Sequence, residues 1–501
     1  MSPLKSHKAL FDAFGIICQC YYKSWHMVAC PTLSKMGIVD LLYLYAKGDA
    51  SPKNNLFIIA RQILRYYVIS ARTYIFIIFA KILFLCKGQK MFFTDKRTYI
   101  IDTYYKIEDL LGGLDPQKDY LTGVVSLLSE YDWDVITVPR FYGDQNLSKY
   151  SRVFDQLRNR QEKVITEYQL LKLIDYLRLL LHITIYPLMV IYVATKLKHS
   201  REDEFIKCAL IKNLHQDSLS AAVRYLASVR LSKIIPHNSR CLQWNENQAI
   251  DKCFNLGLKK FSKDIVIYGA QLYIWPPELL NIHVDSSDMR ALRPDILLVN
   301  GPYYRPDNYA DNIRIGPSLR YSQLWYDDDK VLMNKKKYGK ALVLLPYYID
   351  QIKNIIDIAL QIESIDRLIF KFHPTYSLDS ARSLLPNTAV ISRSNIYQLF
   401  SEIDYVIGAS TGSLLEAIAM GIPVISITIK NAINYSYLPA GIGQGTLWVS
   451  ASTVSEATEA KNNIVSKTAF ETQKMTNDLT MLRSQLFTRP TKEVIRYAFD
   501  L

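Results

Sequence analysis

The segment Asp404–Ile427, DYVIGASTGSLLEAIAMGIPVISI, decides the fold that this chain adopts. It opens with an apolar run that ends at Gly408, passes through the small residues Ala409–Gly412, and continues from Ser413 as a helix-forming stretch. A second apolar run, Pro423–Ile427, follows it. Strand, short loop, helix and strand in this order form the repeating unit of a parallel sheet. The segment therefore predicts one unit of a doubly wound α/β domain.

The loop of this unit also predicts a phosphate-binding site. A helix that starts near Ser413 directs its first N–H groups and the positive end of its dipole at whatever occupies the loop. Ser410, Thr411, Gly412 and Ser413 would then contact the phosphate, and Glu416 would accept a hydrogen bond from a ribose hydroxyl. The alternative is purely structural: Ser410 or Thr411 caps the helix and Glu416 completes a capping box.

A second candidate segment is LIFKFHP, Leu368–Pro374. Pro374 prevents the strand from continuing, so His373 lies at its carboxyl end, where open α/β sheets bind ligands. We predict that His373 is catalytic, either as a donor to a leaving phosphate or as a general acid. Pro374 would contribute to the same donor site. Lys371 would neutralise phosphate charge there, with a salt-bridged edge residue as the alternative.

Strand-length apolar runs alternate with helical stretches through most of the remaining chain. A chain of 501 residues exceeds the usual size of one core, and the charged stretch Tyr326–Lys337 is typical of a linker. We therefore predict an α/β fold of two Rossmann-like domains. The expected strands are Tyr99–Tyr105, Trp133–Pro139, Ser239–Trp244, Ile265–Gly269 and Asp295–Val299, then Ala341–Leu345, Leu368–Phe372, Ala389–Ile391, Tyr405–Ile407 and Pro423–Ile427.

The predicted domains follow from these runs. Residues 98–325 form the first Rossmann-like domain, with a helical insertion around 150–235, and residues 338–485 form the second. The long helical stretch Val454–Arg483 closes the second domain. Residues 486–501, with the helix Glu493–Phe499, return to the first domain. Residues 1–97 are a basic, mostly helical extension.

Most of the net positive charge of the chain lies in residues 1–97. Residues 1–97 hold 14 Lys or Arg against 4 Asp or Glu, within a net charge of +13 for the whole chain. Because these basic residues alternate with apolar runs, they favour an anionic membrane surface over nucleic acid as the partner. The uncharged run Leu179–Thr195 has the minimum length of a membrane span, but Pro187 interrupts it. We expect a buried or interfacial helix there.

The sequence shows neither a clear secretory signal peptide nor a common metal-binding pattern. Asp12 interrupts the first apolar stretch and no small-residue cleavage site follows, so we expect a cytoplasmic protein attached peripherally to the inner face of the membrane. Cys18, Cys20 and Cys30, with His26 between them, match no common zinc spacing, so no metal site is expected.

The first domain offers a candidate acceptor site. Gln243–Gln248 (QWNENQ) and Tyr268–Tyr273 (YGAQLY) each follow or complete an expected strand and combine amides with aromatic rings. Amides pair with sugar hydroxyls and aromatic rings stack on sugar faces. The residues chosen as acceptor contacts are Trp244, Asn247 and Gln271.

A general base is expected beside that site. Glu246 is the first choice, because a transfer to a hydroxyl needs a carboxylate facing that hydroxyl. Its structural alternative is a helix-starting Glu just before the expected helix Ala249–Leu256. Asp102, at the end of the first strand, is the alternative base, and Gly316–Arg320 would close on the cleft.

Two of these segments resemble a known family. The order strand, Ser-Thr-Gly-Ser-Leu-Leu-Glu-Ala, Gly-Ile-Pro-Val is similar to the donor-site signature of GT-B glycosyltransferases, and the resemblance covers roughly Lys340–Ile427. A His-Pro followed by Ser-Thr resembles the GT-B enzymes that build bacterial capsules, lipopolysaccharide and teichoic acids. The Trp-x-Glu-Asn and Gly-x-Gln stretches of the first half are similar to the same enzymes.

This resemblance implies a GT-B glycosyltransferase that takes a nucleotide-sugar donor, CMP- or CDP-linked, and a glycan or lipid-linked glycan acceptor. It implies a co-substrate rather than a cofactor, and no metal. Two alternatives stay open: a sugar-nucleotide 2-epimerase of the same fold, which normally has a paired-Gly loop, and a non-catalytic polysaccharide assembly protein.

Overall fold

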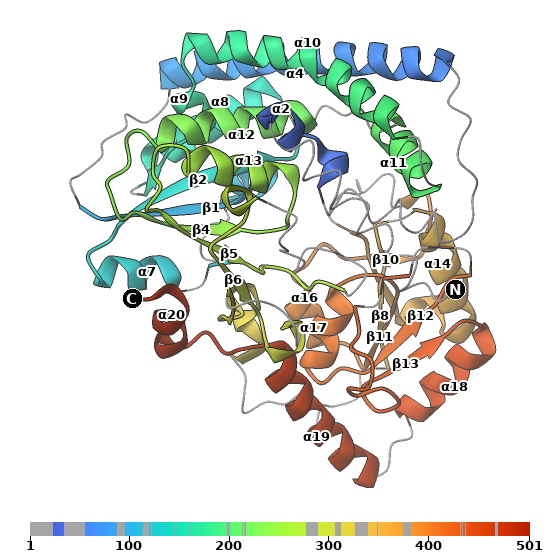
Figure 1. Ribbon diagram of the computed structural model, residues 1–501. Helices are drawn as coiled ribbons and strands as arrows, with labels where there is room; N and C mark the ends of the chain where they lie inside the picture. Colours follow the sequence, from blue (N-terminus) through green and yellow to red (C-terminus); the bar gives the residue numbers. More distant parts are fainter. Residues whose placement is uncertain are drawn as a thin grey trace.

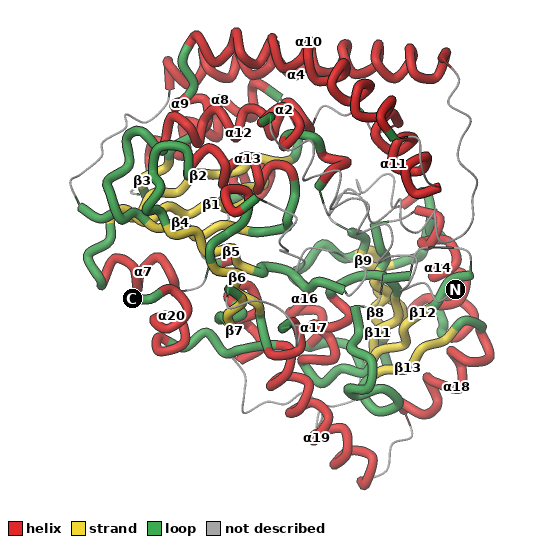
Figure 2. Tube along the Cα trace, viewed as in Figure 1, coloured by secondary structure: helices red, strands yellow, loops and turns green. Residues whose placement is uncertain are grey.

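Two parallel sheets, separate in space, form the framework of the molecule (Figure 2). The computed structural model describes residues 24–34, 56–87, 96–113, 120, 121, 123–144, 146–160, 162–197, 201–212, 214, 217–276, 289–305, 312–325, 339–347, 349–373, 382–430, 432, 434, 435, 437–465 and 469–501. The expected linker Tyr326–Lys337 and the residues Cys18, Cys20 and Pro374 lie outside this part of the chain.

The first sheet has the strand order β3-β2-β1-β4-β5-β6-β7, and the second has the order β10-β9-β8-β11-β12-β13. Every pair of neighbouring strands is parallel. In each sheet the first strand lies in the middle and the order reverses beside it, which is the Rossmann arrangement. Two such sheets in one chain form the GT-B arrangement, and the predicted fold class is confirmed.

All ten expected strands are present. Three further strands, β3, β7 and β13, were not predicted, because each is short and lies at a sheet edge with little apolar pattern. The strands are β1 Thr98–Lys106, β2 Asp134–Tyr142, β3 Lys163–Val164, β4 Arg240–Trp244, β5 Val266–Ala270, β6 Ile296–Val299, β7 Ile313–Ile315, β8 Ala341–Leu344, β9 Leu368–Lys371, β10 Val390–Ile391, β11 Tyr405–Gly408, β12 Val424–Ile427 and β13 Trp448–Ala451.

Helices cover both faces of the first sheet (Figure 1). Side chains alternate along β1: Ile100 faces a core shared with α8 (Leu147–Asn159), α12 (Asp217–Leu231) and α13 (Ala249–Leu258), whereas Tyr99 and Ile101 face α7 (Val124–Glu130) and the C-terminal helix. The remaining helices of this half are α5 Ile107–Leu111, α9 Glu167–Leu170, α10 Leu173–Lys196 and α11 Arg201–Lys212, with 3-10 turns η3 Arg290–Leu292, η4 Pro302–Tyr304 and η5 Leu319–Trp325.

The second half contains α14 Ile349–Ile362, η7 Ile365–Arg367, α16 Ile396–Phe400, α17 Ser413–Ala419, α18 Val454–Val465 and α19 Ala469–Leu486. The expected helical stretch Val454–Arg483 is occupied by two helices, α18 and α19. They pack on different partners: α18 contacts α14 and β13, whereas α19 contacts α17 and η4.

The last helix, α20 (Lys492–Phe499), packs on the first sheet and not on the second. Phe499 lies in one buried cluster with Tyr99 and Tyr268. Arg240 at the start of β4 donates to the carbonyls of Phe499 and Asp500, at 2.7 Å each. The end of the chain therefore completes the core of its first half.

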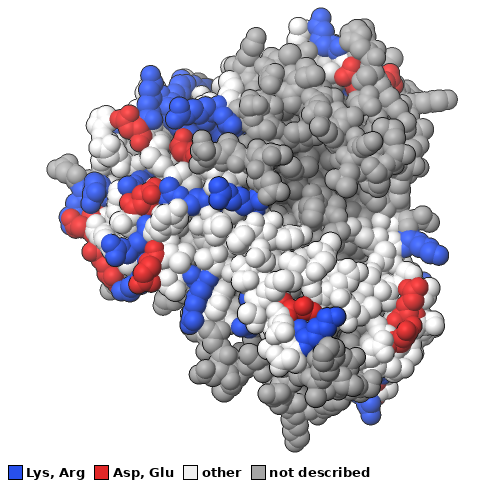
Figure 3. Space-filling model, turned by 60° about the horizontal axis from the view of Figure 1, so that its bottom comes forward, with Lys and Arg blue, Asp and Glu red and all other residues white. Residues whose placement is uncertain are grey.

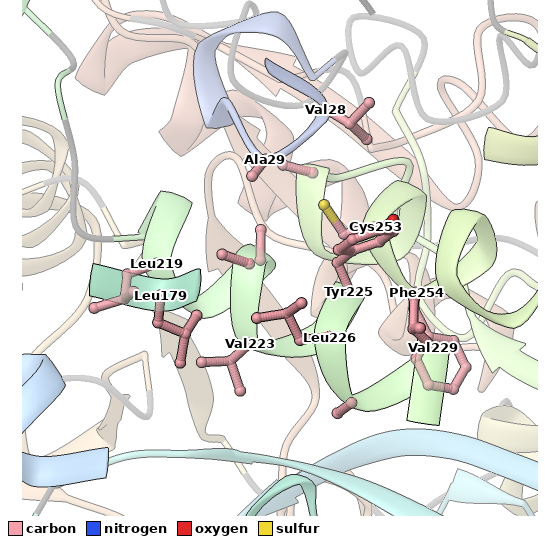
Figure 4. Packing of buried hydrophobic residues seen from close by; sticks show 14 of the residues in the cluster. Val28, Ala29, Leu179, Leu219, Val223, Tyr225, Leu226, Val229, Cys253 and Phe254 are labelled. Atoms are coloured by element: carbon pink, nitrogen blue, oxygen red, sulfur yellow. The ribbon is translucent and has the colours of Figure 1, made fainter. Parts of the chain in front are cut away.

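The N-terminal helices belong to that same core. Met27 and Val28 of α2 (Trp25–Val28, followed by the turn η1, Pro31–Leu33) and Tyr66 of α4 (Leu56–Lys87) are almost fully buried in it. Figure 4 shows Val28 and Ala29 beside side chains of α12 and α13. The described helices of the basic region, α2 and α4, are thus packed on the helical layer of the first sheet.

Two helices, Ile59–Lys87 within α4 and Leu173–Lys196, are long and apolar enough to cross a membrane by length and composition. They lie side by side along one edge of the molecule (Figure 1). The second contains the predicted run Leu179–Thr195, with Pro187 inside a continuous helix. Its buried side packs on α2 and α12.

A buried ion-pair network joins the inserted helices to the first sheet. Asp102 at the end of β1 pairs with Arg140 of β2 and with Arg224 of α12, and Arg140 also pairs with Asp251 of α13. These four side chains are at most 3% exposed. Arg224 also forms an ion pair with Glu167 of α9, with 2.9 Å between its Nη1 atom and Oε1 of the carboxylate. Burial alone would raise the pKa of Asp102, but the two guanidinium groups outweigh it and hold that pKa below its ordinary value.

Removing Arg140 leaves the buried Asp251 without its ion-pair partner and Asp102 with Arg224 alone. We expect Arg140→Met to lower the free energy of unfolding by about 3–5 kcal/mol. Urea denaturation followed by tryptophan fluorescence measures the change. The control is Lys492→Met, which removes an exposed ion pair with Glu130 and should cost less than about 1 kcal/mol. Equal effects of the two variants would contradict the stabilising role of the network.

Candidate active site

A pocket of about 360 Å³ lies between the second sheet and the first half of the chain. This volume is in the range of small-molecule sites. The residues that line it come from both halves: Asp109, Tyr120, Arg320 and Gln323 from the first, and Leu344, Leu345, Lys371, Phe372, His373, Asn395, Ile396, Tyr397, Thr411, Ser413 and Glu416 from the second.

The pocket occupies the point where the strand order of the second sheet reverses. Leu344 at the end of β8 pairs in register with Lys371 of β9 on one side and with Gly408 of β11 on the other. The helix after β8 packs on one face of the sheet and the helix after β11 packs on the opposite face. A crevice therefore opens at the carboxyl ends of these strands, which is where such sheets bind ligands.

The loop after β11 is shaped by close backbone contacts. A Cβ atom at Gly408 would lie 2.8 Å from the carbonyl oxygen of Leu344, so this strand end requires glycine. Ser410 has a positive φ of 47°, and its hydroxyl accepts the N–H of Tyr435 at 3.2 Å. Thr411 and Ser413 line the pocket.

The N-cap residue of α17 is Gly412, which has no side chain to make a capping hydrogen bond. The phosphate-binding role of Ser410 and Thr411 and the alternative capping role both stay predictions.

His373 and Lys371 lie at the end of β9, as the sequence predicts, and both line the pocket. Burial, and then the positive charge of Lys106, lower the pKa of His373. The imidazole is therefore neutral at neutral pH, with one N–H to donate. Its ring meets the ring of Tyr347 edge-on at 5.6 Å. The Lys371 ammonium donates to the carbonyl of Ser394 at 2.7 Å, and burial lowers its pKa.

Glu416 lies on the opposite wall. The hydroxyl of Tyr397 donates to its Oε2 atom at 2.7 Å. Burial raises the pKa of Glu416, and the charge of Arg320 opposes that rise. Arg320 comes from η5 in the first half of the chain, so its place in the pocket agrees with the prediction that Gly316–Arg320 faces the cleft. One pocket thus brings together groups from both domains.

Glu246 lies outside the lining of the pocket, in the loop after β4. Its two carboxylate oxygens accept from Trp244 Nε1 at 2.9 Å and from Gln248 Nε2 at 2.5 Å. Burial, followed by the nearby charge of Asp251, raises the pKa of Glu246 to about 7. A carboxylate with this pKa can accept a proton at neutral pH.

The Glu246 loop is held by the buried ion-pair network. Asp251 accepts the backbone N–H groups of Glu246 and Gln248 at 2.9 Å each, while its other oxygen pairs with Arg140. Asn247 between them has a positive φ of 56°. Asp102, the alternative base, lies within that network and not in the pocket.

The predicted acceptor residues separate into two groups. The ring of Trp244 packs 5.2 Å from that of Tyr120, and the Arg320 guanidinium lies 5.9 Å from the same indole, so Trp244 lies directly behind the pocket wall. Gln271 is buried and its Oε1 accepts the N–H of Asn300 at 2.9 Å, which is a packing role. Asn247 is buried in its loop.

Several pocket residues were not predicted. Asn395 caps α16 by accepting the N–H of Tyr397 at 2.9 Å, and both residues follow β10 at the same sheet edge as His373. Their position directly after an expected strand was an available signal. Asp109 and Tyr120 gave no comparable signal, because only the packing of the two domains brings them to the pocket.

Among the described residues, no three His, Cys, Asp or Glu side chains are grouped as a metal site would require. Cys30 is buried and accepts from the hydroxyl of Tyr186 at 3.3 Å. His26 contacts His182, with 2.8 Å between their Nδ1 atoms.

Comparison with known proteins bears on the fold alone. No protein-family model and no curated protein matches the chain in sequence. The UDP-GlcNAc 2-epimerase from Neisseria meningitidis is similar in structure at 10% identity and a TM-score of 0.45, over 80% of this chain and 99% of that one. The wall teichoic acid polymerase TagF is similar in structure at 10% identity and a TM-score of 0.39, over 89% of this chain and 97% of that one. A trehalose-phosphate synthase from Burkholderia vietnamiensis is similar at 10% identity and a TM-score of 0.39, over 80% of this chain and 99% of that one.

Proposed function

We propose that this protein is a GT-B glycosyltransferase that moves a sugar from a nucleotide-activated donor, CMP- or CDP-linked, to a growing cell-surface polysaccharide or glycolipid. The observation that carries the proposal is the pocket at the strand reversal of the second sheet, in which Lys371, His373 and Arg320 surround one space. Cationic and N–H groups converging on a crevice of this kind suit an anionic leaving group. The cytidine preference rests on the resemblance of the His-Pro and Ser-Thr segments.

Donor binding is assigned to the second sheet. The hydroxyls of Thr411 and Ser413 would bind the donor phosphates together with Lys371, and Glu416 would accept from a ribose hydroxyl. Tyr397 and Ser413 both hydrogen-bond the Glu416 carboxylate and hold it at the pocket lining. The nucleotide sugar is a co-substrate, so the proposal requires no cofactor.

The transfer itself requires a base and a group that assists the leaving phosphate. In the proposed step Glu246 takes the proton of an acceptor hydroxyl, the hydroxyl oxygen bonds to the anomeric carbon, and the bond from that carbon to the donor phosphate breaks. The neutral imidazole of His373 donates to the departing phosphate oxygen, whose charge grows in the transition state. Trp244 and Tyr120 would form the acceptor side, next to Glu246.

Binding of the nucleotide is the first test. We expect CMP or CDP to raise the melting temperature more than UDP or GDP, since a ligand at about 100 times its Kd adds roughly 2.7 kcal/mol of stability. Differential scanning fluorimetry over this panel measures the shift. No shift with any nucleotide would contradict the proposal and favour an assembly protein. A response to UDP-GlcNAc, with epimerised product and no acceptor requirement, would favour the epimerase.

Substitutions of pocket residues should distinguish the groups that bind the donor from the group that accelerates the transfer step. His373→Ala should lower kcat by about 100- to 10,000-fold with little change in donor Kd, because its hydrogen bond strengthens in the transition state. Glu416→Ala and Thr411→Ala should mainly raise the donor Kd, because both residues line the pocket and their proposed contacts are present in both states. Ser410 does not line the pocket and holds the N–H of Tyr435, so Ser410→Ala should act only through the shape of the loop. Steady-state kinetics and calorimetry provide the two readouts. An active His373→Ala enzyme would overturn the catalytic assignment.

The raised pKa of Glu246 predicts the pH dependence. A general base works when ionised, so kcat/KM should rise with pH through about 7 and level off above it. Glu246→Gln should abolish transfer and leave donor affinity intact, whereas Glu130→Gln, at an exposed position, should leave the profile unchanged. If Glu246→Gln stays fully active, Glu246 is not the base; Asp102 then replaces it only if Asp102→Asn is inactive while its circular dichroism and donor Kd are unchanged.

A further inference from the structure

The two long helices α4 and α10 are apolar on their outer faces as well as on their buried ones. Tyr66, Ile77 and Ala80 of α4 lie in the protein core, yet the same helix exposes Phe57, Leu64, Val68, Ile75, Phe79, Ile82 and Leu85. Helix α10 exposes Leu173, Ile174, Leu177, Leu180, Leu181, Leu188 and Tyr192. Exposed arginines, Arg61, Arg65 and Arg72 on α4 and Arg178 on α10, lie among these apolar side chains. Many exposed apolar side chains interspersed with basic ones mark an interaction site with an apolar, anionic partner.

These helices are held flat against the protein. They run antiparallel, because Tyr67 donates to the carbonyl of Thr184 at 3.4 Å and Tyr74 donates to that of Tyr176 at 3.1 Å. At its end α4 is joined to α8 by the ion pair Lys87–Asp155, at 2.7 Å. A helix packed along its whole length on the protein in this way is placed to lie parallel to the membrane, with its outer face in one leaflet, and not to span the bilayer.

A cavity of about 980 Å³ opens beside the junction of α4, α9, α10 and α12. Its apolar lining consists of Ile78, Ile82, Leu85, Leu170, Leu171, Leu173, Tyr176 and Ile234. Gln169 and four basic residues, Lys81, Lys172, Arg230 and Lys233, complete the wall, and no described acidic residue lines it. An apolar lining that can hold an acyl chain, combined with basic groups that can bind a headgroup phosphate, suits an anionic lipid.

The basic groups of this cavity differ in how they are held. Arg230 is neutralised by a two-point ion pair with Asp175, at 2.7 and 2.9 Å. The Lys81 ammonium is fixed by the carbonyls of Tyr168 and Leu171, at 2.6 and 3.1 Å, which do not cancel its charge. Lys172 and Lys233 are exposed at the rim. Positive charge therefore remains at the mouth of an apolar cavity.

On the face in Figure 3, Lys and Arg occur interspersed with Asp and Glu over the described part of the surface. The basic residues around the cavity are distinguished by their position between two exposed apolar helices.

We propose that this cavity binds one anionic phospholipid of a membrane leaflet on which α4 and α10 lie. An acyl chain occupies the apolar lining, and the lipid phosphate lies at Lys81, Lys172 and Lys233. The inference does not rest on the proposed transferase activity, since its evidence lies on the first half of the chain and away from the nucleotide pocket.

Vesicle binding of the full-length protein tests the proposal. We expect at least about tenfold tighter binding to phosphatidylcholine vesicles that contain about one third phosphatidylglycerol than to phosphatidylcholine alone. Lys172→Glu/Lys233→Glu should remove that preference. The matched control, Lys353→Glu/Lys474→Glu, makes the same charge change at exposed positions of α14 and α19 and should change binding by less than about twofold.

A third variant distinguishes lipid binding in the cavity from nonspecific attraction of the basic residues to an anionic membrane. Ile78→Trp narrows the cavity without changing charge, and should also remove the preference for phosphatidylglycerol. Circular dichroism and the nucleotide-induced melting shift of each variant show that the fold and the donor pocket are intact.

Three results would overturn the lipid site: equal binding to both vesicle types, equal losses in the charge variant and its control, or an unchanged preference in Ile78→Trp. Displacement by inorganic phosphate at matched ionic strength would also overturn it, in favour of a free-anion site. Absence of nucleotide binding in the unchanged protein would count against the proposed function and leave the lipid site standing.

Discussion

The pairing of Asp102 with Arg140 and Arg224 is the constraint on which the first half of this molecule depends. Three elements far apart in sequence, β1, β2 and α12, meet at this one carboxylate. Burying these charges is costly unless each keeps its partners, so the inserted helices cannot dock in another register without leaving a charge uncompensated. The same network reaches Asp251, which fixes the backbone on both sides of Glu246. A structural feature of the domain thereby sets the position of the proposed base.

The first strand lies in the middle of each sheet, so the strand order reverses beside it in both. In the second sheet the helices after β8 and β11 pack on opposite faces, and the crevice at this point is lined by Lys371, His373 and Thr411. In the first sheet the equivalent point lies between β1 and β4, where Asp102 and Gln243 pair in register and belong to the same buried hydrogen-bond network.

Much of this arrangement is present in local sequence patterns, because buried strands of a parallel sheet are short apolar runs with sharp ends. All ten expected strands, and the place of His373 and Thr411 at one edge, could be derived in this way. The edge strands β3, β7 and β13 could not, since edge positions need little apolar sequence. The ion-pair role of Asp102 also escaped prediction, because its partners Arg140 and Arg224 come from distant segments. The cavity beside α4 and α10 depends on tertiary packing, and only the exposed faces of those helices hint at it in sequence.

The position of α20 has a consequence for the order in which the chain acquires its structure during synthesis. Ile495, Ala498 and Phe499 fill part of the core that contains β1 and β5, although the whole second sheet lies between them and these strands in the sequence. A ribosome therefore releases the entire second domain before the first can close its hydrophobic core. Until the last residues emerge, the aromatic side chains of Tyr99 and Tyr268 remain uncovered on one face of the nascent sheet. Exposed apolar surface of that kind is what chaperones bind, so the first-made half of this protein is the last to become native.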